Sequence, residues 1–281
     1  MLHIQNPLIL GSAGVVGKAL VDEYAKDKSV IPLRYDIATN NHHDCRKDKR
    51  NLKTAIEISD FVFFLAYDVG GAKFLDKNKK NISLIQNNCR MMDNVFGLLQ
   101  DTGKPFIFAS SQMSNMLHSS YGVCKAIGEH YTNAIGGKYV RFWNVYGPEH
   151  DEEKAHVITD FINNALTTKQ INMLTDGDEK RQFLHTEDCG RCLATLATKY
   201  DEIPDNEPLD VTIFKWNTIK DIANIVADNI PGTVVTPGER QDMTQGDKQN
   251  QPDEAILKYW QPTISLEDGI KGLIDEYSKG N

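Results

Sequence analysis

A phenol and an ammonium group stand four residues apart in the middle of the chain, at Tyr121 and Lys125. The stretch around them has helical periodicity, and residues with this spacing lie on one face of a helix. An ammonium group beside a phenol lowers the pKa of the phenol, so the pattern predicts Tyr121 as a proton acceptor near neutral pH. Tyrosine and lysine often have this spacing by chance, so the pair needs support from the rest of the chain.

Two hydroxyl groups precede this pair, at the end of an apolar stretch with the character of a buried strand. Ser110 and Ser111 follow residues 106–109, which are all apolar. Ligands of open parallel sheets bind at the carboxyl ends of the strands. A serine at this place can hydrogen-bond a substrate oxygen or merely cap the strand, and both interpretations stay open.

A glycine-rich turn follows the first apolar stretch and opens the first helical one. Its glycines stand three residues apart, at Gly11, Gly14 and Gly17. Such a turn allows a tight bend and a close approach of phosphate groups, and the free N–H groups of the helix can receive a pyrophosphate. The string alone is weak evidence, because an ordinary strand-to-helix turn also uses glycine.

A carboxylate supports the dinucleotide interpretation, because Asp36 ends the second predicted strand, 19 residues beyond Gly17. A carboxylate there can accept hydrogen bonds from both hydroxyl groups of an adenosine ribose, and it would repel a 2′-phosphate. The pattern therefore predicts NAD as the cofactor. Arg34 shares the strand face of Asp36, which keeps NADP open as the less favoured alternative.

These groups need a sheet to bring them together, and the first half of the chain predicts one. Apolar stretches of strand length alternate there with helical stretches. Strands are expected at residues 8–10, 30–35, 60–66, 105–109 and 139–142, and helices at 15–26, 82–100 and 121–134. This alternation predicts an α/β fold with a Rossmann-type, doubly wound parallel sheet.

The pattern changes after Pro148, where one amphipathic helix is expected over residues 151–168, an irregular stretch over 233–252 and a last helix over 266–277. We expect a small mixed C-terminal lobe that binds the substrate. The predicted domains are residues 1–147, with a returning segment at about 184–215, for the cofactor, and residues 148–183 and 216–281 for the substrate-binding lobe.

Composition narrows the possible partners and the compartment. The net charge of −8 argues against nucleic acid and anionic membranes as partners. Five irregularly spaced cysteines argue against a disulfide framework, and we expect Cys189 and Cys192 to be buried, unreactive thiols. With no metal-ligand cluster, signal peptide or membrane-length apolar run apparent, the sequence predicts a cytoplasmic protein without a metal site.

Further motifs carry a family resemblance when they are taken with the glycine turn, the serines and the Tyr–Lys pair. They are Asp44-Cys45, Leu65-Ala66-Tyr67, the segment 141–148 (Arg-Phe-Trp-Asn-Val-Tyr-Gly-Pro) and the segment 176–188, which contains Arg181 and ends in His-Thr-Glu-Asp. Together they resemble the extended short-chain dehydrogenase/reductases, especially the NAD-dependent nucleotide-sugar epimerases and dehydratases. The resemblance covers nearly the whole chain.

The resemblance implies a redox cycle on a sugar nucleotide. Tyr121 would take the proton of a sugar hydroxyl group, usually at C4, while NAD takes the hydride. Ser111 and Lys125 would complete the catalytic group. The residues implied to bind the cofactor are Gly11, Ser12, Ala13, Gly14, Val15, Val16, Gly17, Asp36, Asp44, Cys45, Leu65, Ala66, Tyr67, Ser110, Tyr121, Lys125, Phe142, Asn144 and Val145. Those implied to bind the nucleotide-diphosphate sugar are Asp68, Gly70, Ser111, Gln112, Asn144, Arg181 and Arg240.

Three segments are similar to the GDP-sugar branch of this family, which includes GDP-mannose 3,5-epimerases and GDP-fucose synthases. They are residues 66–71, residues 153–155 around Lys154, and residues 156–158 around His156. Lys154 and His156 are thus candidate acids facing the sugar, with exposed helix charges as the alternative for each.

The chain departs from these relatives at the position of their carbon base, where it has Met113 after Gln112. Neither side chain can take a proton. We therefore expect a 4-epimerase, with a 4-keto reductase as the alternative and a dehydratase less favoured; outside this class, a non-catalytic NAD-binding protein remains possible. The resemblance also implies a homodimer formed through the helix at 82–100 and the helix that carries Tyr121.

Overall fold

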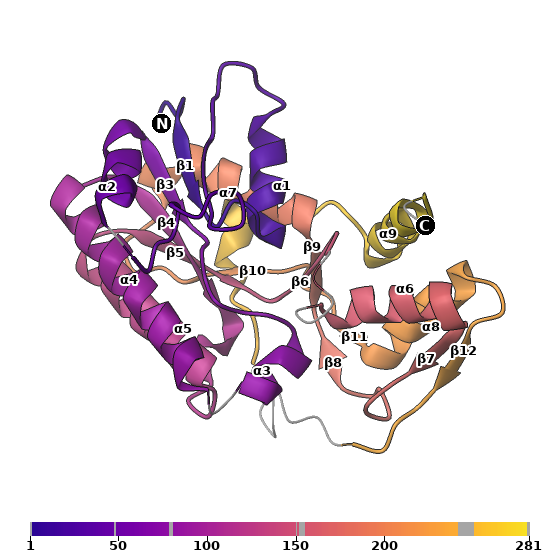
Figure 1. The fold of residues 1–281 in the computed structure, drawn as a ribbon. Coiled ribbons are helices and arrows are strands. Elements are labelled where there is room, and N and C mark those ends of the chain that lie inside the picture. Colours follow the sequence, from indigo (N-terminus) through magenta and orange to yellow (C-terminus); the bar gives the residue numbers. More distant parts are fainter. Residues whose placement is uncertain are drawn as a thin grey trace.

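The computed structural model describes residues 2–47, 49–78, 81–149, 151, 155–240 and 250–279. Its centre is a six-stranded parallel sheet in the order β10-β5-β4-β3-β1-β2 (Figure 1). The strands are β1 (Pro7–Leu10), β2 (Leu33–Tyr35), β3 (Phe61–Phe64), β4 (Phe106–Ser111), β5 (Lys138–Phe142) and β10 (Leu209–Val211). The doubly wound parallel sheet predicted from the sequence is confirmed.

Helices cover both faces of this sheet (Figure 1). One face carries α1 (Val15–Tyr24) and α7 (Thr186–Thr198), and the other carries α2 (Lys49–Ile58), α4 (Ile82–Thr102) and α5 (Ser120–Ala134). In β1, Leu8 and Leu10 pack into the core on the α4 side, whereas Ile9 packs with α1 and α7. A strand that is covered on both faces needs apolar residues at every position, which is why these strands read as unbroken apolar runs.

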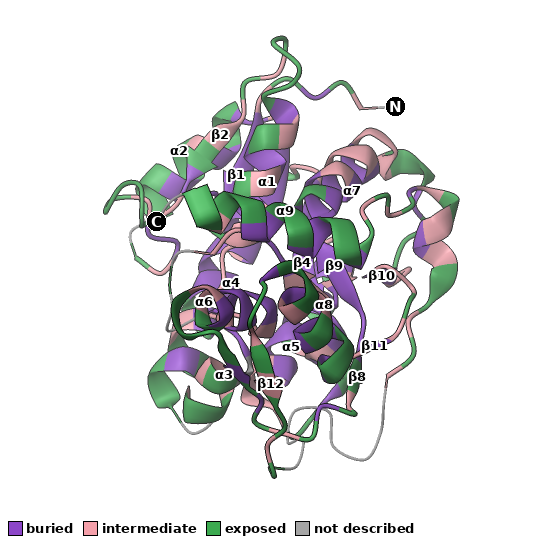
Figure 2. Ribbon diagram, turned by 90° about the vertical axis from the view of Figure 1, so that its right-hand side faces the viewer, coloured by how far each residue is buried: buried purple, intermediate pink, exposed green. Residues whose placement is uncertain are grey.

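A second group of elements lies beyond the carboxyl ends of the strands and has its own apolar core. Its helices are α6 (Val157–Thr168), α8 (Ile219–Asn229) and α9 (Leu266–Lys279). Short strand pairs join them: β7 (Gln170–Asn172) with β12 (Val234–Thr236), β8 (Lys180–Arg181) with β11 (Asn217–Thr218), and β6 (Asn144–Tyr146) with β9 (Phe183–His185). The inward faces of these helices are buried and their outer faces exposed (Figure 2). The domain boundaries expected from the sequence stay a prediction.

Short elements complete the chain: α3 (Ala72–Asn78) and the single-turn 3₁₀ helices η1 (Gln112–Asn115), η2 (Tyr200–Glu202) and η3 (Glu254–Lys258). Helix η1 connects the end of β4, at Ser111, with α5, which carries Tyr121 and Lys125.

Some boundaries differ from the expected ones for clear reasons. The strand expected over residues 30–35 is shortened to β2, because Pro32 has no N–H group to donate to the sheet. The helix expected over 151–168 begins only at Val157, and residues 152–154 lie outside the described residues. Helix α2 was not expected, since only two of its side chains, Leu52 and Ile56, are buried and most of its other residues are polar.

The predicted buried thiols and the packing of α4 can now be described. Cys189 and Cys192 are buried, and burial raises the pKa of both thiols, as expected for unreactive cysteines. The apolar stripe of α4 packs into the core beneath the sheet. Within the described ranges, the structure contains no helix long and apolar enough to cross a bilayer.

Candidate active site

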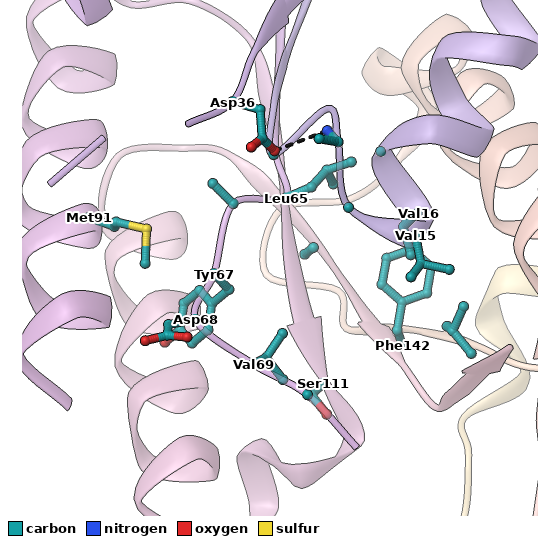
Figure 3. A pocket seen from close by; sticks show the side chains of 18 of the residues that line it. Val15, Val16, Asp36, Leu65, Tyr67, Asp68, Val69, Met91, Ser111 and Phe142 are labelled. Atoms are coloured by element: carbon teal, nitrogen blue, oxygen red, sulfur yellow. Dashed lines mark hydrogen bonds between the residues drawn. The ribbon is translucent and has the colours of Figure 1, made fainter. Parts of the chain in front are cut away.

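A cleft of about 720 Å³ lies at the carboxyl ends of the parallel strands, between the sheet and the second group of elements. The cleft is lined by residues of the glycine turn, the end of β2, the segment after β3, the end of β4, α5, the end of β5 and the approach to α6. Figure 3 shows Asp36 at one end of the cleft and Ser111 toward the other. The cleft therefore contacts both the predicted cofactor residues and most of the predicted substrate residues.

The glycine turn forms one wall of the cleft through Gly11, Ala13, Gly14, Val15, Val16 and Gly17. Gly11 has a φ of +89°, and a Cβ atom there would lie 2.6 Å from the backbone nitrogen of Ala66. A Cβ atom on Gly17 would overlap the carbonyl oxygen of Gly11, so α1 can approach the turn only without a side chain there. Ser12 is buried and is not among the lining residues. The turn leaves the N-terminus of α1 open to the cleft, which suits a pyrophosphate.

Asp36 is held at the end of β2 by backbone N–H groups. Its carboxylate accepts hydrogen bonds from Ala13, at 3.0 Å, and from Ala38, at 2.8 Å; the first is the dashed line in Figure 3. The side chain is thus fixed beside the glycine turn and lines the cleft. Arg34, which kept NADP open, is exposed and is not among the lining residues.

The predicted adenine-contacting pair, Asp44 and Cys45, also lines the cleft. Asp44 is buried and accepts two hydrogen bonds from Arg46, at 2.8 and 2.9 Å. This contact outweighs burial and lowers the pKa of Asp44 to about 2. His43, stacked on Tyr35 at 4.4 Å between ring centroids, completes this end of the cleft.

Tyr121 and Lys125 lie one helical turn apart on α5, and both line the cleft. The ammonium group of Lys125 donates to the carbonyl oxygen of Ala109 at 2.5 Å and lies 3.5 Å from the centre of the Tyr67 ring. Burial lowers the pKa of Lys125 to about 7, despite the opposing electrostatic effects of Cys124 and Glu129. The positive charge is therefore held mainly by a carbonyl group and an aromatic face.

The expected lowering of the phenol pKa is wrong for the protein without ligand. Burial raises the pKa of Tyr121 above its ordinary value, and only a hydrogen bond from Ser111 opposes this effect. The ammonium group of Lys125 lies 5.7 Å from the ring centre of Tyr121 and closer to Tyr67. Desolvation thus dominates, and the phenol is held in its neutral form.

The two serines at the end of β4 point to opposite sides, as neighbours on a strand do. The hydroxyl group of Ser111 forms a hydrogen bond with Tyr121 and accepts another from the backbone N–H of Met113 at 3.2 Å. Ser110 instead donates its hydroxyl group to buried Glu129 at 2.6 Å, and Glu129 accepts two hydrogen bonds from Arg141. A contact between Ser110 and a cofactor would therefore involve its backbone, which lies at the cleft wall.

On the side of the cleft opposite Asp36, hydrogen bonds hold the side chains of Gln112, Asp68 and Asn144 in place. Asn250 donates to both the backbone oxygen and the side-chain oxygen of Gln112, at 2.8 and 2.6 Å. Asn87 donates to the carboxylate of Asp68 at 3.1 Å, and Asn144 donates to the carbonyl oxygen of Gln182 at 3.2 Å. The predicted substrate residues here line the cleft; they are Asp68, Gly70, Ser111, Gln112 and Asn144.

The predicted phosphate-binding arginines are not part of this wall. Arg181 is buried in β8 and donates to the carbonyl oxygen of Lys180. Arg240 is exposed, and its backbone N–H donates to Leu174 at 3.0 Å. Neither lines the cleft, so their role in holding a diphosphate stays a prediction. Lys154 lies outside the described residues, whereas His156 lines the cleft.

Comparison with known proteins now adds the family. The sequence model described as "NAD dependent epimerase/dehydratase family" matches residues 7–212, which is well over half of the chain. This chain belongs to that family. It is thus an NAD-dependent enzyme of the nucleotide-sugar epimerase/dehydratase type, as the motifs implied.

Individual members of this family resemble the chain only distantly. A GDP-mannose 3,5-epimerase of Oryza sativa subsp. indica is 25% identical, over 94% of this chain and 79% of its own length. A UDP-glucose 4-epimerase of Thermotoga maritima, solved with UDP-glucose, has a TM-score of 0.82 at 20% identity, covering 98% of this chain and 99% of that one. A GDP-6-OMe-4-keto-L-xylo-heptose reductase of C. jejuni has a TM-score of 0.85 at 16% identity, covering 100% and 99%. These structures share the epimerase/dehydratase fold.

The cleft also contains residues to which the sequence analysis gave no role, among them Arg46, Trp143 and Glu149. The Arg46 side chain meets Asp44 two residues earlier, a local pairing that the sequence could have signalled. Trp143 donates to buried Asp210 at 3.3 Å, and Glu149 binds His156. The Trp143 contact joins residues far apart in the chain, and Glu149 stands seven residues before His156, where no predicted element joins the two.

Proposed function

We propose that this protein is an NAD-dependent nucleotide-sugar epimerase that acts through a transient 4-keto sugar. The observation that supports this most directly is the convergence of Tyr121, Ser111 and Lys125 on one cleft with the glycine turn. The substrate would be a nucleotide-diphosphate sugar lying between the β4 edge and the approach to α6. Its sugar and its nucleotide base stay open in this proposal.

The residues around the glycine turn fit NAD. Gly11 and Gly17 let the turn pack against Ala66 and against its own carbonyl group, where any Cβ atom would clash, and Gly14 lines the cleft where a pyrophosphate would lie. Asp36 would accept hydrogen bonds from the adenosine ribose, and its charge would repel a 2′-phosphate, which favours NAD over NADP. Arg46 is paired with Asp44, which weakens it as an alternative partner for such a phosphate. When bound, NAD would supply the hydride acceptor at C4 and return the hydride to either face of the sugar.

The protein's own residues would hold and move the proton of the C4 hydroxyl group. Tyr121 would accept this proton and later return it, while the Ser111 hydroxyl group hydrogen-bonds to the phenol oxygen of Tyr121. Lys125 would stabilise the charge that develops on the phenol oxygen. Gln112 and Met113 have no group that can remove a proton from carbon, which favours chemistry confined to C4 over dehydration.

A 4-keto nucleotide-sugar reductase is the second candidate, and one observation favours it. Burial holds the phenol of Tyr121 in its neutral form, which is the form that donates a proton to a ketone oxygen. A reductase would use only this half of the cycle, oxidise one reduced cofactor per turnover and then exchange the oxidised form for a fresh reduced one.

One experiment separates the two candidates. One sample of the purified protein is denatured and its nucleotide content is measured. A second, native sample is given UDP-glucose, GDP-mannose and a 4-keto sugar nucleotide, with and without added NADH. An epimerase converts a sugar nucleotide without net change in NADH, whereas a reductase oxidises one NADH per 4-keto sugar. If the denatured sample releases no nicotinamide dinucleotide and calorimetry detects no binding of NAD⁺ or NADH, the proposal is wrong.

The predicted homodimer remains part of the proposal. Ile85 on α4 and Ile127 and Tyr131 on α5 are apolar and each at least 36% exposed, on the two helices expected to meet their copies. Exposed apolar side chains gathered on one surface are typical of an interface. A monomeric mass in light scattering at micromolar concentration would contradict it.

A further inference from the structure

The face of the Tyr67 ring lies against the ammonium group of Lys125. Tyr67 follows β3, lines the cleft and is labelled in Figure 3. Its ring centre is 3.5 Å from Nζ of Lys125, whereas the ring centres of Phe108 and Tyr121 are 4.9 and 5.7 Å away. A cation is attracted to the face of an aromatic ring when it lies within about 6 Å of the ring centre. Tyr67 is therefore the closest of three aromatic rings around this buried charge.

The Tyr67 ring is held in this position by its own contacts. Its hydroxyl group donates to Sδ of Met92, on α4, at 3.7 Å. Its ring meets that of Tyr121 edge to face, with 5.8 Å between the ring centroids, and lies 6.4 Å from that of Phe108. Burial raises the pKa of Tyr67 far above its ordinary value, so its phenol is neutral. Tyr67 thus offers Lys125 the face of a ring and no negative charge.

The carboxylates nearest to Lys125 are engaged with other partners. Glu129, one turn further along α5, accepts two hydrogen bonds from Arg141 of β5, so its charge opposes the effect of burial on Lys125 only in part. Asp68, after β3, accepts a hydrogen bond from Asn87 of α4 at 3.1 Å. Among the residues that the structure describes, no carboxylate forms an ion pair with Lys125.

Two thiols and a phenol are the other titratable groups on this side of α5. Cys124 shares a hydrogen bond with Cys89 of α4, and burial raises the pKa of Cys124 to about 11. Burial likewise keeps the phenol of Tyr121 neutral. Neither Cys124 nor Tyr121 is therefore an anion at neutral pH. The ring face of Tyr67 and the carbonyl oxygen of Ala109 are thus the groups that hold the ammonium charge.

We propose that Tyr67 is a positioning residue of the catalytic pair: the face of its ring keeps Lys125 in the charged form where the fold excludes water, so that this charge is present when Tyr121 accepts a proton. Tyr67 acts through Lys125 and exchanges no proton itself. The first half of the inference concerns the protein without ligand. The second half rests on the proposed function, because it needs a reaction in which Tyr121 moves a proton.

The physical reason is that an aromatic face attracts an ammonium group and gains nothing from a neutral amine. Contact with Tyr67 therefore favours the charged form of Lys125 and opposes the burial that lowers its pKa to about 7. Because this value is close to neutral pH, a modest loss of attraction would lower the charged fraction of Lys125 several-fold. A neutral amine at this place could not stabilise the negative charge that forms on the oxygen of Tyr121.

The test changes the attraction between ring and cation while keeping the shape of the ring. Tyr67 is replaced by phenylalanine, 4-fluorophenylalanine and 3,4,5-trifluorophenylalanine, because fluorine withdraws electron density from the ring face. The pKa of Lys125 is measured in the full-length protein by NMR titration of ¹³C-labelled lysine, with its signal assigned by its loss in K125M. We expect Y67F to keep this pKa nearly unchanged, since the face remains. The pKa should then fall stepwise with fluorine, by about one unit or more in the trifluorinated protein.

The matched control places the same trifluorinated ring at Phe161 of α6, which is buried in the separate apolar core of the second group of elements. This change should leave the pKa of Lys125 where it is, although it puts fluorine into a packed core in the same way. A Lys125 pKa that stays constant across the series at position 67 would overturn the inference. An equal fall in the Phe161 control would overturn it too, because the effect would then come from general loosening of the fold.

The second part measures kcat/KM against pH for the same proteins, with UDP-glucose, GDP-mannose and a 4-keto sugar nucleotide. Loss of the Lys125 proton at lower pH should move the alkaline decline of kcat/KM to lower pH, in the order of the fluorine series and by the same amount as the pKa of Lys125. A kcat/KM that falls equally at every pH would show a merely structural role and overturn the second half of the inference. Absence of conversion in the unaltered protein would refute the proposed function and the second half with it, whereas the titration of Lys125 still decides the first half.

Discussion

Replacement of Lys125 by methionine should make the protein more stable at neutral pH while removing a group that the proposed chemistry needs. Lys125 is 3% exposed, and burial lowers its pKa from 10.5 to about 7. Each pKa unit corresponds to about 1.4 kcal/mol, so holding this ammonium group in the folded protein costs about 5 kcal/mol at pH values below 7. Methionine has a similar length and carries no charge, so K125M is free of this cost.

The sign of the pH dependence follows from proton binding. Between pH 7 and pH 10.5 the unfolded chain keeps the Lys125 proton and the folded protein releases it. The unfolded state then binds more protons, so the free energy of unfolding of the unaltered protein rises with pH across this window. The stability advantage of K125M should therefore fall from about 4 kcal/mol at pH 7 to about 2 kcal/mol at pH 9 and nearly vanish near pH 10.5.

The assay is urea unfolding of both proteins at pH 7, 8, 9 and 10, read by circular dichroism. Lost contacts of Lys125 with Ala109 and Tyr67 add an offset that does not vary with pH, so the slope of the difference is the decisive quantity. K53M, at a lysine of α2 that is 55% exposed, is the matched control and should show no such slope. A difference between K125M and the unaltered protein that is constant from pH 7 to 10 would refute the reasoning.

Four further predictions concern the same cleft and its support. Y121F should lower kcat about 10²- to 10⁴-fold while leaving NAD affinity in calorimetry within a few-fold, because only proton transfer is lost. D36N removes the ionic acceptor, so it should weaken NAD binding about ten- to hundredfold, a loss of about 1.5–3 kcal/mol, and narrow the preference for NAD over NADP. An NAD affinity of D36N equal to that of the unaltered protein in a fluorescence titration would contradict this. G17A should lower the unfolding free energy by about 1–3 kcal/mol and abolish NAD binding, because its methyl group meets the glycine-turn carbonyl. E129A should lower the unfolding free energy by about 3–5 kcal/mol in urea titrations, as Arg141 loses its buried partner; a loss below 1 kcal/mol would show that the pair is not needed.

The sequence predicts those parts of the fold that short-range physics determines. Buried parallel strands must be apolar at every position, so β1, β3 and β4 are evident from their runs alone. The glycine turn is likewise local, because backbone geometry at Gly11 and close packing at Gly17 leave few alternatives. These features, with the family motifs, were enough to predict the sheet and most of the residues that line the cleft.

The direction of individual side chains was not predictable, because it depends on partners far away in the chain. Ser110 turns from the cleft since Glu129, on α5, and Arg141, on β5, form a buried acceptor and donor beneath it. The pKa of Tyr121 depends on how completely the fold excludes water around it. Burial cannot be derived from the spacing of Tyr121 and Lys125, which is why the expected direction of the phenol pKa was wrong.

The edge strand β10 has a consequence for how the protein is made. The strand that borders β5 comes from residues 209–211, and α7, from residues 186–198, covers the face of the sheet that bears Ile9. A nascent chain that has released only β1 to β5 therefore presents an apolar face that α1 covers only in part, and an unpaired strand edge. Ribosomes add about 5–20 residues per second, so this exposed state lasts several seconds during synthesis. The interval between β5 and β10 is when the emerging polypeptide most needs chaperone protection against aggregation.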